Sequence, residues 1–171
     1  MGLKVRGRRM KERLLFVIDE SIQLELNVSA LYKIFHAAFP ADADFWWELL
    51  IEEENHAALI RSIKEAFMPA GKFSDGMFLN SLEILKKHNQ ALCHLIREYR
   101  NAVPSREDAF KSALEVEQSA CEIHFQKFIE RKEKSRIEKI FEQLNRDDKD
   151  HVKRIRSYME VYGIDSVGPN I

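Results

Sequence analysis

Two short acid-histidine pairs stand out because each lies within a helical stripe of apolar residues. Glu53 precedes His56 by three residues, and Asp148 precedes His151 by the same spacing. One helical turn separates the members of each pair, so both side chains point from one helix face. A carboxylate buried on such a face must be paired, protonated or bound to metal, because an isolated buried charge is strongly unfavourable. The histidine one turn away favours metal binding.

The apolar positions around each pair recur at alternating steps of four and three residues, the spacing of a core-facing stripe. The first stripe consists of Leu49, Glu53, His56, Ile60, Ile63 and Phe67. The second consists of Leu144, Asp148, His151, Ile155, Tyr158 and Tyr162. One pair alone is weak evidence, but two matching pairs indicate the two halves of one site.

Long amphipathic helices are expected to position these residues, and we expect an all-α protein. The expected helices run from about Arg8 to Phe39, Phe45 to Phe67, Phe78 to Tyr99, Arg106 to Glu130 and Ile137 to Tyr162. Pro40 ends the first helix, and a short turn at 41–44 makes the first two helices an antiparallel hairpin. Asp42 or Asp44 is available as the N-cap of the second helix.

The remaining segments separate or end these helices. Proline and glycine mark a loop at 69–76, residues 101–104 break the third helix, and charged residues 131–136 separate the last two. Ser105 to Asp108 resembles a capping box with Asp in the Glu position. Residues 163–171 are expected to form a short irregular tail. The whole chain, 1–171, is expected to be a single domain.

The first two helices align with the last two as an internal repeat. The matched positions are Glu25 with Glu117, Tyr32 with His124, Glu53 with Asp148, and His56 with His151. Such a duplication predicts a bundle with approximate two-fold symmetry whose axis passes through the site. Tyr32 and His124 lie two turns beyond Glu25 and Glu117, where they pack in the core or orient a ligating carboxylate.

Four carboxylates and two imidazoles projecting inward from four helices form the ligand set of a di-iron or di-manganese carboxylate bundle. Two divalent ions bring four positive charges, and the four carboxylates balance them. We expect Glu25 and Glu117 as terminal ligands, Glu53 and Asp148 as bridging ligands, and His56 and His151 as terminal nitrogen ligands. His36, His88 and His94 have no carboxylate at a useful spacing on their own faces, so they are interpreted as ordinary residues.

Composition excludes several other classes of protein. The formal net charge of −1 gives no general attraction to nucleic acid or to an anionic membrane. No uninterrupted apolar run approaches the roughly 18 residues of a membrane span. The two cysteines, Cys93 and Cys121, are too few for a disulfide framework and suit a reducing cytoplasm.

At these residues the sequence resembles the ferritin-like superfamily, in particular the rubrerythrin-type di-iron domain. The resembling motifs are Glu25 with Tyr32, residues 52–56, Glu117 with His124, and residues 141–151. The resemblance implies a ferritin-like four-helix bundle in which the 78–99 helix is a long crossover between two antiparallel hairpins. It further implies a non-haem centre of two Fe ions that reacts with hydrogen peroxide or dioxygen. Some relatives couple this reaction to iron oxidation and storage.

Three departures from that family matter. No Cys-x-x-Cys pair occurs in this sequence, so we expect no rubredoxin-like domain here and expect electrons to come from an external donor protein or from Fe(II) itself. Ala120 stands where rubrerythrins carry a further glutamate, so the six-ligand set is more like that of bacterioferritin. Asp148 is one methylene shorter than glutamate, which shortens its reach to a bridging position.

The favoured function is therefore an oxidoreductase acting on peroxide, dioxygen or ferrous iron. The alternatives are iron storage without turnover and a non-catalytic helical bundle whose exposed aromatic residues form an interface. A homodimer or a larger homo-oligomer is expected. The sequence leaves open the native oxidant, the electron donor, the choice of iron, manganese or a mixed Fe/Mn pair, and the oligomer.

Overall fold

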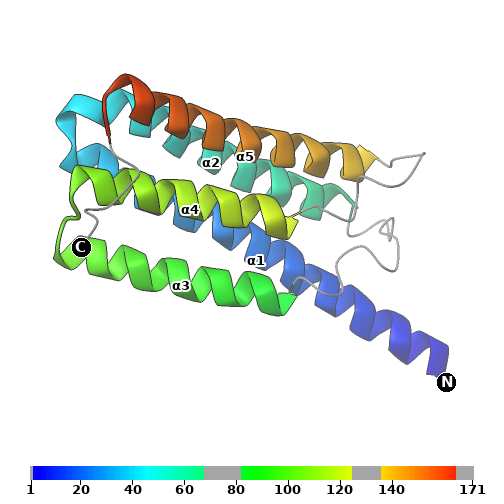
Figure 1. The fold of residues 1–171 in the computed structure, drawn as a ribbon. Coiled ribbons are helices and arrows are strands. Elements are labelled where there is room, and N and C mark those ends of the chain that lie inside the picture. The colour runs from blue at the N-terminus through cyan, green and yellow to red at the C-terminus, as the bar shows by residue number, and fades with distance from the viewer. Residues whose placement is uncertain (1, 68–81, 125–135, 165–171) are drawn as a thin grey trace.

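A computed structural model describes residues 2–67, 82–124 and 136–164, and these residues are helical with short connections (Figure 1). Within them the elements are α1 (Gly2–Ala38), the 3-10 helix η1 (Pro40–Asp42), α2 (Ala43–Phe67), α3 (Leu82–Asn101), α4 (Arg106–His124) and α5 (Arg136–Val161). No strand occurs in these ranges, which confirms the prediction of an all-α chain there. None of the described helices is long and apolar enough to cross a membrane.

Most observed helix ends lie close to the predicted ends. α1 ends at Ala38, two residues before Pro40, but it begins at Gly2, earlier than the expected Arg8. α5 lies one residue earlier at both ends than expected. The predicted loop at 69–76, the first four residues of the predicted 78–99 helix, and residues 125–135 lie outside the described ranges, as do the tail residues beyond 164.

Two antiparallel helix pairs, α1–α2 and α4–α5, make up most of the molecule, and α3 packs against α1 (Figure 1). α2 lies beside α5, and α1 contacts α4, so the two pairs face each other. The start of α1 projects beyond the ends of the other helices (Figure 1). This arrangement is compatible with a four-helix bundle formed by the two pairs.

Aromatic packing between the two pairs holds one end of the interior together. The fully buried Trp46 ring lies 4.4 Å from that of Phe110, 5.0 Å from Phe35 and 5.6 Å from Tyr32, measured between centroids. These rings come from α1, α2 and α4. A buried aromatic side chain removes roughly 150–250 Å² from water, so this cluster is a major stabilising contact between the two pairs.

A buried carboxylate ties η1 to α4 and α5 at the same end. Arg106 donates from Nε and Nη2 to Asp42 Oδ2 and Oδ1 at 2.8 and 2.7 Å, and the Tyr158 hydroxyl donates to Oδ1 at 3.0 Å. The hydrogen bond from Arg106 lowers the pKa of Asp42. Asp42 was one of two candidate N-caps for α2. The structure instead commits its carboxylate to Arg106 and Tyr158.

Local capping explains the ends of α4 and α5. The Asp108 amide donates to Ser105 Oγ at 3.0 Å, and that hydroxyl donates to Asp108 Oδ2 at 2.8 Å, which confirms the predicted capping role of Ser105. α5 ends at Val161 and is followed at Gly163 by a φ of 61°, and the Ile164 amide then donates to the Met159 carbonyl at 2.8 Å. This pattern is a glycine helix stop, and it buries Ile164.

Most described apolar positions of the two predicted stripes are buried. Leu49, Ile60, Ile63, Leu144 and Ile155 all have relative exposures of 2% or less. Tyr162 is 56% exposed, so its prediction as a core residue was wrong. It stands after the last residue of α5, beyond the helices that would cover it.

Candidate metal centre

The structure brings all six predicted ligand residues together in the interior between the two helix pairs. α1 supplies Glu25, α2 supplies Glu53 and His56, α4 supplies Glu117, and α5 supplies Asp148 and His151. None is more than 7% exposed. They form two groups whose ligand atoms lie within 4.8 Å of one another: Glu25, His56 and Asp148 in the first, and Glu53, Glu117 and His151 in the second.

The two groups are related as the sequence repeat requires. Exchanging each residue for its repeat partner turns Glu25, His56 and Asp148 into Glu117, His151 and Glu53, which is the second group. Each group therefore combines residues of both helix pairs. The exchange of the groups is what a two-fold axis through the site would produce.

Glu53 lies between the two histidines and offers one oxygen to each. Its Oε2 lies 3.6 Å from His56 Nδ1, and its Oε1 lies 2.9 Å from His151 Nδ1. The outer members of the groups also face these nitrogens, with Glu25 Oε2 3.7 Å from His56 Nδ1 and Glu117 Oε1 3.4 Å from His151 Nδ1. The imidazole centroids are 5.6 Å apart. Glu53 is thus placed as a bridging carboxylate would be.

Several of these atoms are buried without a hydrogen bond. Glu53 Oε1, Asp148 Oδ2 and Nδ1 of both histidines have no hydrogen-bond partner among the described residues, despite the short approaches just given. Buried polar atoms are nearly always satisfied, so converging orphaned atoms indicate a missing positive partner. Carboxylate oxygen with imidazole nitrogen, and no sulfur, suits divalent ions of the iron and manganese class. The residues present fit the implied pair of ions.

The interior charge balance of the metal-free chain shows the same need for cations. Burial raises the pKa of Asp148 well above its ordinary value, and the charges of Glu25 and Glu117 raise it further. Burial alone would lower the pKa of His56, but the facing carboxylates of Glu25 and Glu53 outweigh it and raise this pKa to about 11. The pKa of His151 is also raised, against the effect of burial, by Glu117 and Glu52. Protons therefore supply positive charge when no ion does.

The outer nitrogens of the histidines are faced by residues that sequence reasoning missed. His151 Nε2 donates to Glu52 Oε2 at 2.7 Å, and Arg154 Nη1 donates to the same oxygen at 2.5 Å. His56 Nε2 lies 3.7 Å from Asp147 Oδ2, beyond hydrogen-bond distance. Glu52 and Asp147 each immediately precede the acid of a predicted pair. The doubled acids at 52–53 and 147–148 were the signal that could have found them.

Tyr32 contacts a site residue of the other helix pair and not the glutamate on its own helix. Its hydroxyl donates a 2.5 Å hydrogen bond to Glu117 Oε1, whereas the sequence associated Tyr32 with Glu25 on its own helix. Tyr32 is fully buried. Burial and the nearby charge of Glu117 raise the pKa of its phenol, so it stays a donor. The side chain of its repeat partner, His124, lies outside the described side chains.

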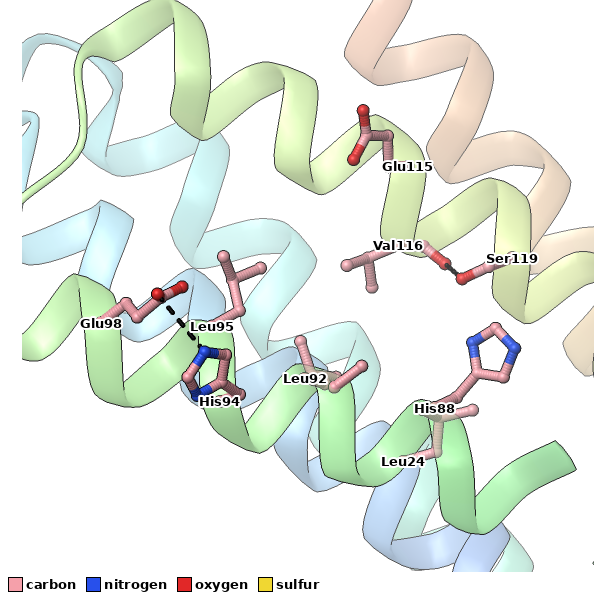
Figure 2. A pocket seen from close by; sticks show the side chains of 10 residues that line it. Leu24, His88, Leu92, His94, Leu95, Glu98, Glu115, Val116 and Ser119 are labelled. Carbon is pink, nitrogen blue, oxygen red and sulfur yellow. Dashed lines mark hydrogen bonds and ion pairs between the residues drawn. The ribbon is translucent and has the colours of Figure 1, made fainter. Parts of the chain in front are cut away.

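The other described histidines lie outside this centre. His36 Nδ1 is 2.9 Å from the Ala43 carbonyl oxygen. His94 Nε2 lies 3.4 Å from Glu98 Oε1 on its own helix, so the expectation that it has no carboxylate partner was wrong, although both side chains are mostly exposed. His88 and His94 line a separate cavity of about 430 Å³ whose apolar residues include Leu24 and Leu92 (Figure 2). None of the six candidate ligands lines it.

No family model matches this sequence, and searches of the curated proteins and of the solved structures returned no match.

Proposed function

We propose that this chain is a ferritin-like, rubrerythrin-type four-helix bundle that binds two iron ions and reduces hydrogen peroxide or dioxygen. In this proposal the α1–α2 and α4–α5 pairs form the bundle, and α3 is the crossover that joins them from outside. The identity of the helices that supply the candidate ligands supports this proposal. Both three-residue groups are drawn from α1, α2, α4 and α5, and no residue of α3 takes part.

One observation carries the proposal: orphaned carboxylate and imidazole atoms converge at the centre of the bundle. A degenerate bundle that merely retained polar residues would satisfy them with hydrogen bonds. Instead Glu53 Oε1 lies 2.9 Å from His151 Nδ1 and Glu53 Oε2 lies 3.6 Å from His56 Nδ1, and neither Nδ1 atom has a hydrogen-bond partner among the described residues. A divalent ion in each group would accept these lone pairs and neutralise the carboxylates.

The chain's own residues would have distinct tasks. His56 and His151 would bind through Nδ1, Glu53 would bridge through its two oxygens, and Glu25 and Glu117 would be terminal ligands. Asp148 would be the second bridging ligand, with a shorter reach. The buried aromatic cluster beside Tyr32 would keep bulk water from the centre.

Two ferrous ions, when bound, supply the two electrons that, with two protons, reduce one peroxide to two waters. The next turnover needs two electrons from outside the chain. We propose an external donor protein, because the sequence holds no Cys-x-x-Cys electron-transfer motif. Ferrous iron itself is the other source. The free, exposed thiol of Cys93 suits a reducing compartment, and we extend the proposal to the cytoplasm.

The test begins with metal content. Metal-free protein is loaded anaerobically with Fe(II), desalted and analysed for iron, and it is then mixed with peroxide or air in a stopped-flow absorbance instrument. We expect two irons per chain and rapid oxidation that a reductant reverses. Glu53→Ala and His151→Ala should lose bound iron, whereas Glu54→Ala, at an exposed position on the same helix, should keep it.

Other outcomes identify the alternatives. Many irons per chain, with a large assembly by light scattering, would indicate storage. Fewer than one bound metal after reconstitution with either iron or manganese would reject the metal centre and leave a non-catalytic bundle. Reconstitution with manganese beside iron compares the two ions directly. Light scattering of the loaded protein also tests the proposed homodimer or larger homo-oligomer.

A further inference from the structure

We propose that the two metal positions are unequal: the position of Glu53, Glu117 and His151 loads first and holds its ion more tightly than that of Glu25, His56 and Asp148. We call them the His151 position and the His56 position. Glu52, supported by Arg154, is the positioning residue that makes the difference. This inference rests on the proposed function and refines it.

The first argument concerns the outer hydrogen bond of each histidine. A neutral imidazole carries one N–H and one lone pair, and the partner of one nitrogen decides which nitrogen can bind metal. Glu52 accepts the N–H of His151 Nε2 at 2.7 Å. When an ion replaces the Nδ1 proton, the lone pair is therefore at Nδ1, the nitrogen that faces Glu53 and Glu117. The ring is held in its ligating orientation before any ion arrives.

Arg154 keeps Glu52 in place from the solvent side. Its Nη1 bonds the same Glu52 oxygen at 2.5 Å, and its Nη2 bonds Glu48 Oε2 at 3.2 Å. Since the Glu52 side chain is 40% exposed, water would otherwise compete for it. The guanidinium restricts the carboxylate to the position that His151 needs.

The His56 position lacks this arrangement although the sequence repeat supplies the corresponding acid. Asp147 Oδ2 is 3.7 Å from His56 Nε2, too far for a hydrogen bond. Its other oxygen instead accepts from Gln143 Nε2 at 2.7 Å, along its own helix. The contact with Asp147 therefore does not hold His56 Nε2 as Glu52 holds His151 Nε2.

The second argument concerns the carboxylates. In the His151 position, the Tyr32 hydroxyl fixes Glu117, and Glu53 has the full reach of a glutamate. The His56 position depends on Asp148, which is one methylene shorter than its repeat partner Glu53. Both arguments favour the same position, so loading should be sequential, with one resident ion and one that exchanges readily.

Anaerobic titration of the metal-free protein with Co(II), against a competing chelator and followed by visible absorbance, tests this directly. We expect two binding steps. His151→Ala should remove the tighter step, and His56→Ala the weaker one. Removing an outer partner of a ligating histidine typically weakens metal binding by about 10–100-fold, so Glu52→Ala should weaken only the tighter step by about that factor.

Matched variants separate positioning from general damage to the fold. Asp147→Ala truncates the corresponding acid of the other repeat and should leave both steps nearly unchanged. Glu52→Gln retains an oxygen that can accept from His151 and should recover much of the affinity lost in Glu52→Ala. Two equal steps, or equal losses in Glu52→Ala and Asp147→Ala, would overturn the inequality while leaving the metal centre intact. No Co(II) binding at all would overturn both proposals.

Discussion

The Tyr32 hydroxyl donates a 2.5 Å hydrogen bond to Glu117 Oε1, joining two residues that lie 85 positions apart in the chain. The bond crosses from the α1–α2 pair to the α4–α5 pair. Tyr32 thus donates to a site carboxylate without itself belonging to the proposed ligand set. Tyr32 therefore links the stability of the interior to the orientation of a proposed ligand.

Removing that hydroxyl should destabilise the metal-free protein. Tyr32→Phe keeps the ring but leaves Glu117 without its donor, and hydrogen bonds to charged groups contribute about 1.5–3 kcal/mol. We expect urea unfolding of the metal-free variant to show a loss in that range. Tyr99→Phe removes a bond between the half-buried Tyr99 and Ser112 hydroxyls and should lose only about 0.5–1.5 kcal/mol. Equal losses would show that Tyr32 contributes only packing.

Metal loading should stabilise the fold. An ion that binds only the folded chain adds about 2.7 kcal/mol when its free concentration is 100 times its dissociation constant. Thermal unfolding with Mn(II) or Zn(II) should therefore shift upward in the wild type and in Glu54→Ala. The shift should vanish in Glu53→Ala, which loses the carboxylate that faces both histidines. A full shift in Glu53→Ala would argue against the centre described above.

Acid should weaken the contact between Asp42 and Arg106. Arg106 holds the pKa of Asp42 below its ordinary value of 3.8, so its stabilising effect is complete above that value and disappears as pH falls through the lower folded pKa. The difference in unfolding free energy between wild type and Asp42→Asn should thus shrink from about pH 5 to about pH 2. Urea unfolding across this range measures it. Asp44→Asn, at an exposed position, is the matched control for the loss of one carboxylate.

The glycine stop after α5 should be sensitive to substitution. Gly163 has a φ of 61°, and a Cβ added there would meet nothing within 4 Å. The effect of Gly163→Ala is therefore confined to the backbone, where left-handed geometry costs about 1–2 kcal/mol. Urea unfolding should show a loss of that size. Ser157→Ala, at an exposed position inside α5, should change stability by less than about 0.5 kcal/mol.

Helical periodicity was enough to find the six central residues. Glu53 and His56 share a face because one turn separates them, and the stripe around them could only point inward. The same periodicity identified Asp148 and His151, and the internal repeat then matched the two pairs. Such predictions succeed because they depend on the rise and rotation within one helix, which the sequence determines locally.

Contacts between helices could not be predicted in the same way. The bond from His151 to Glu52 spans 99 positions and depends on the rotation of α2 against α5. Asp42 carries an ordinary capping signal, yet a bidentate contact from Arg106, 64 positions away, decides its role. Tyr162 continues the periodic stripe of α5, but the periodicity does not show where the covering helices stop.

The division of the two ligand groups between the helix pairs has a consequence for how the protein matures. Residues up to the end of α2 include only two members of one group and one of the other. A growing chain would thus hold no complete set until α5 had been synthesised and docked. Ion capture would then come last in biogenesis, and truncated or misassembled chains would stay empty in a cell that contains ample metal.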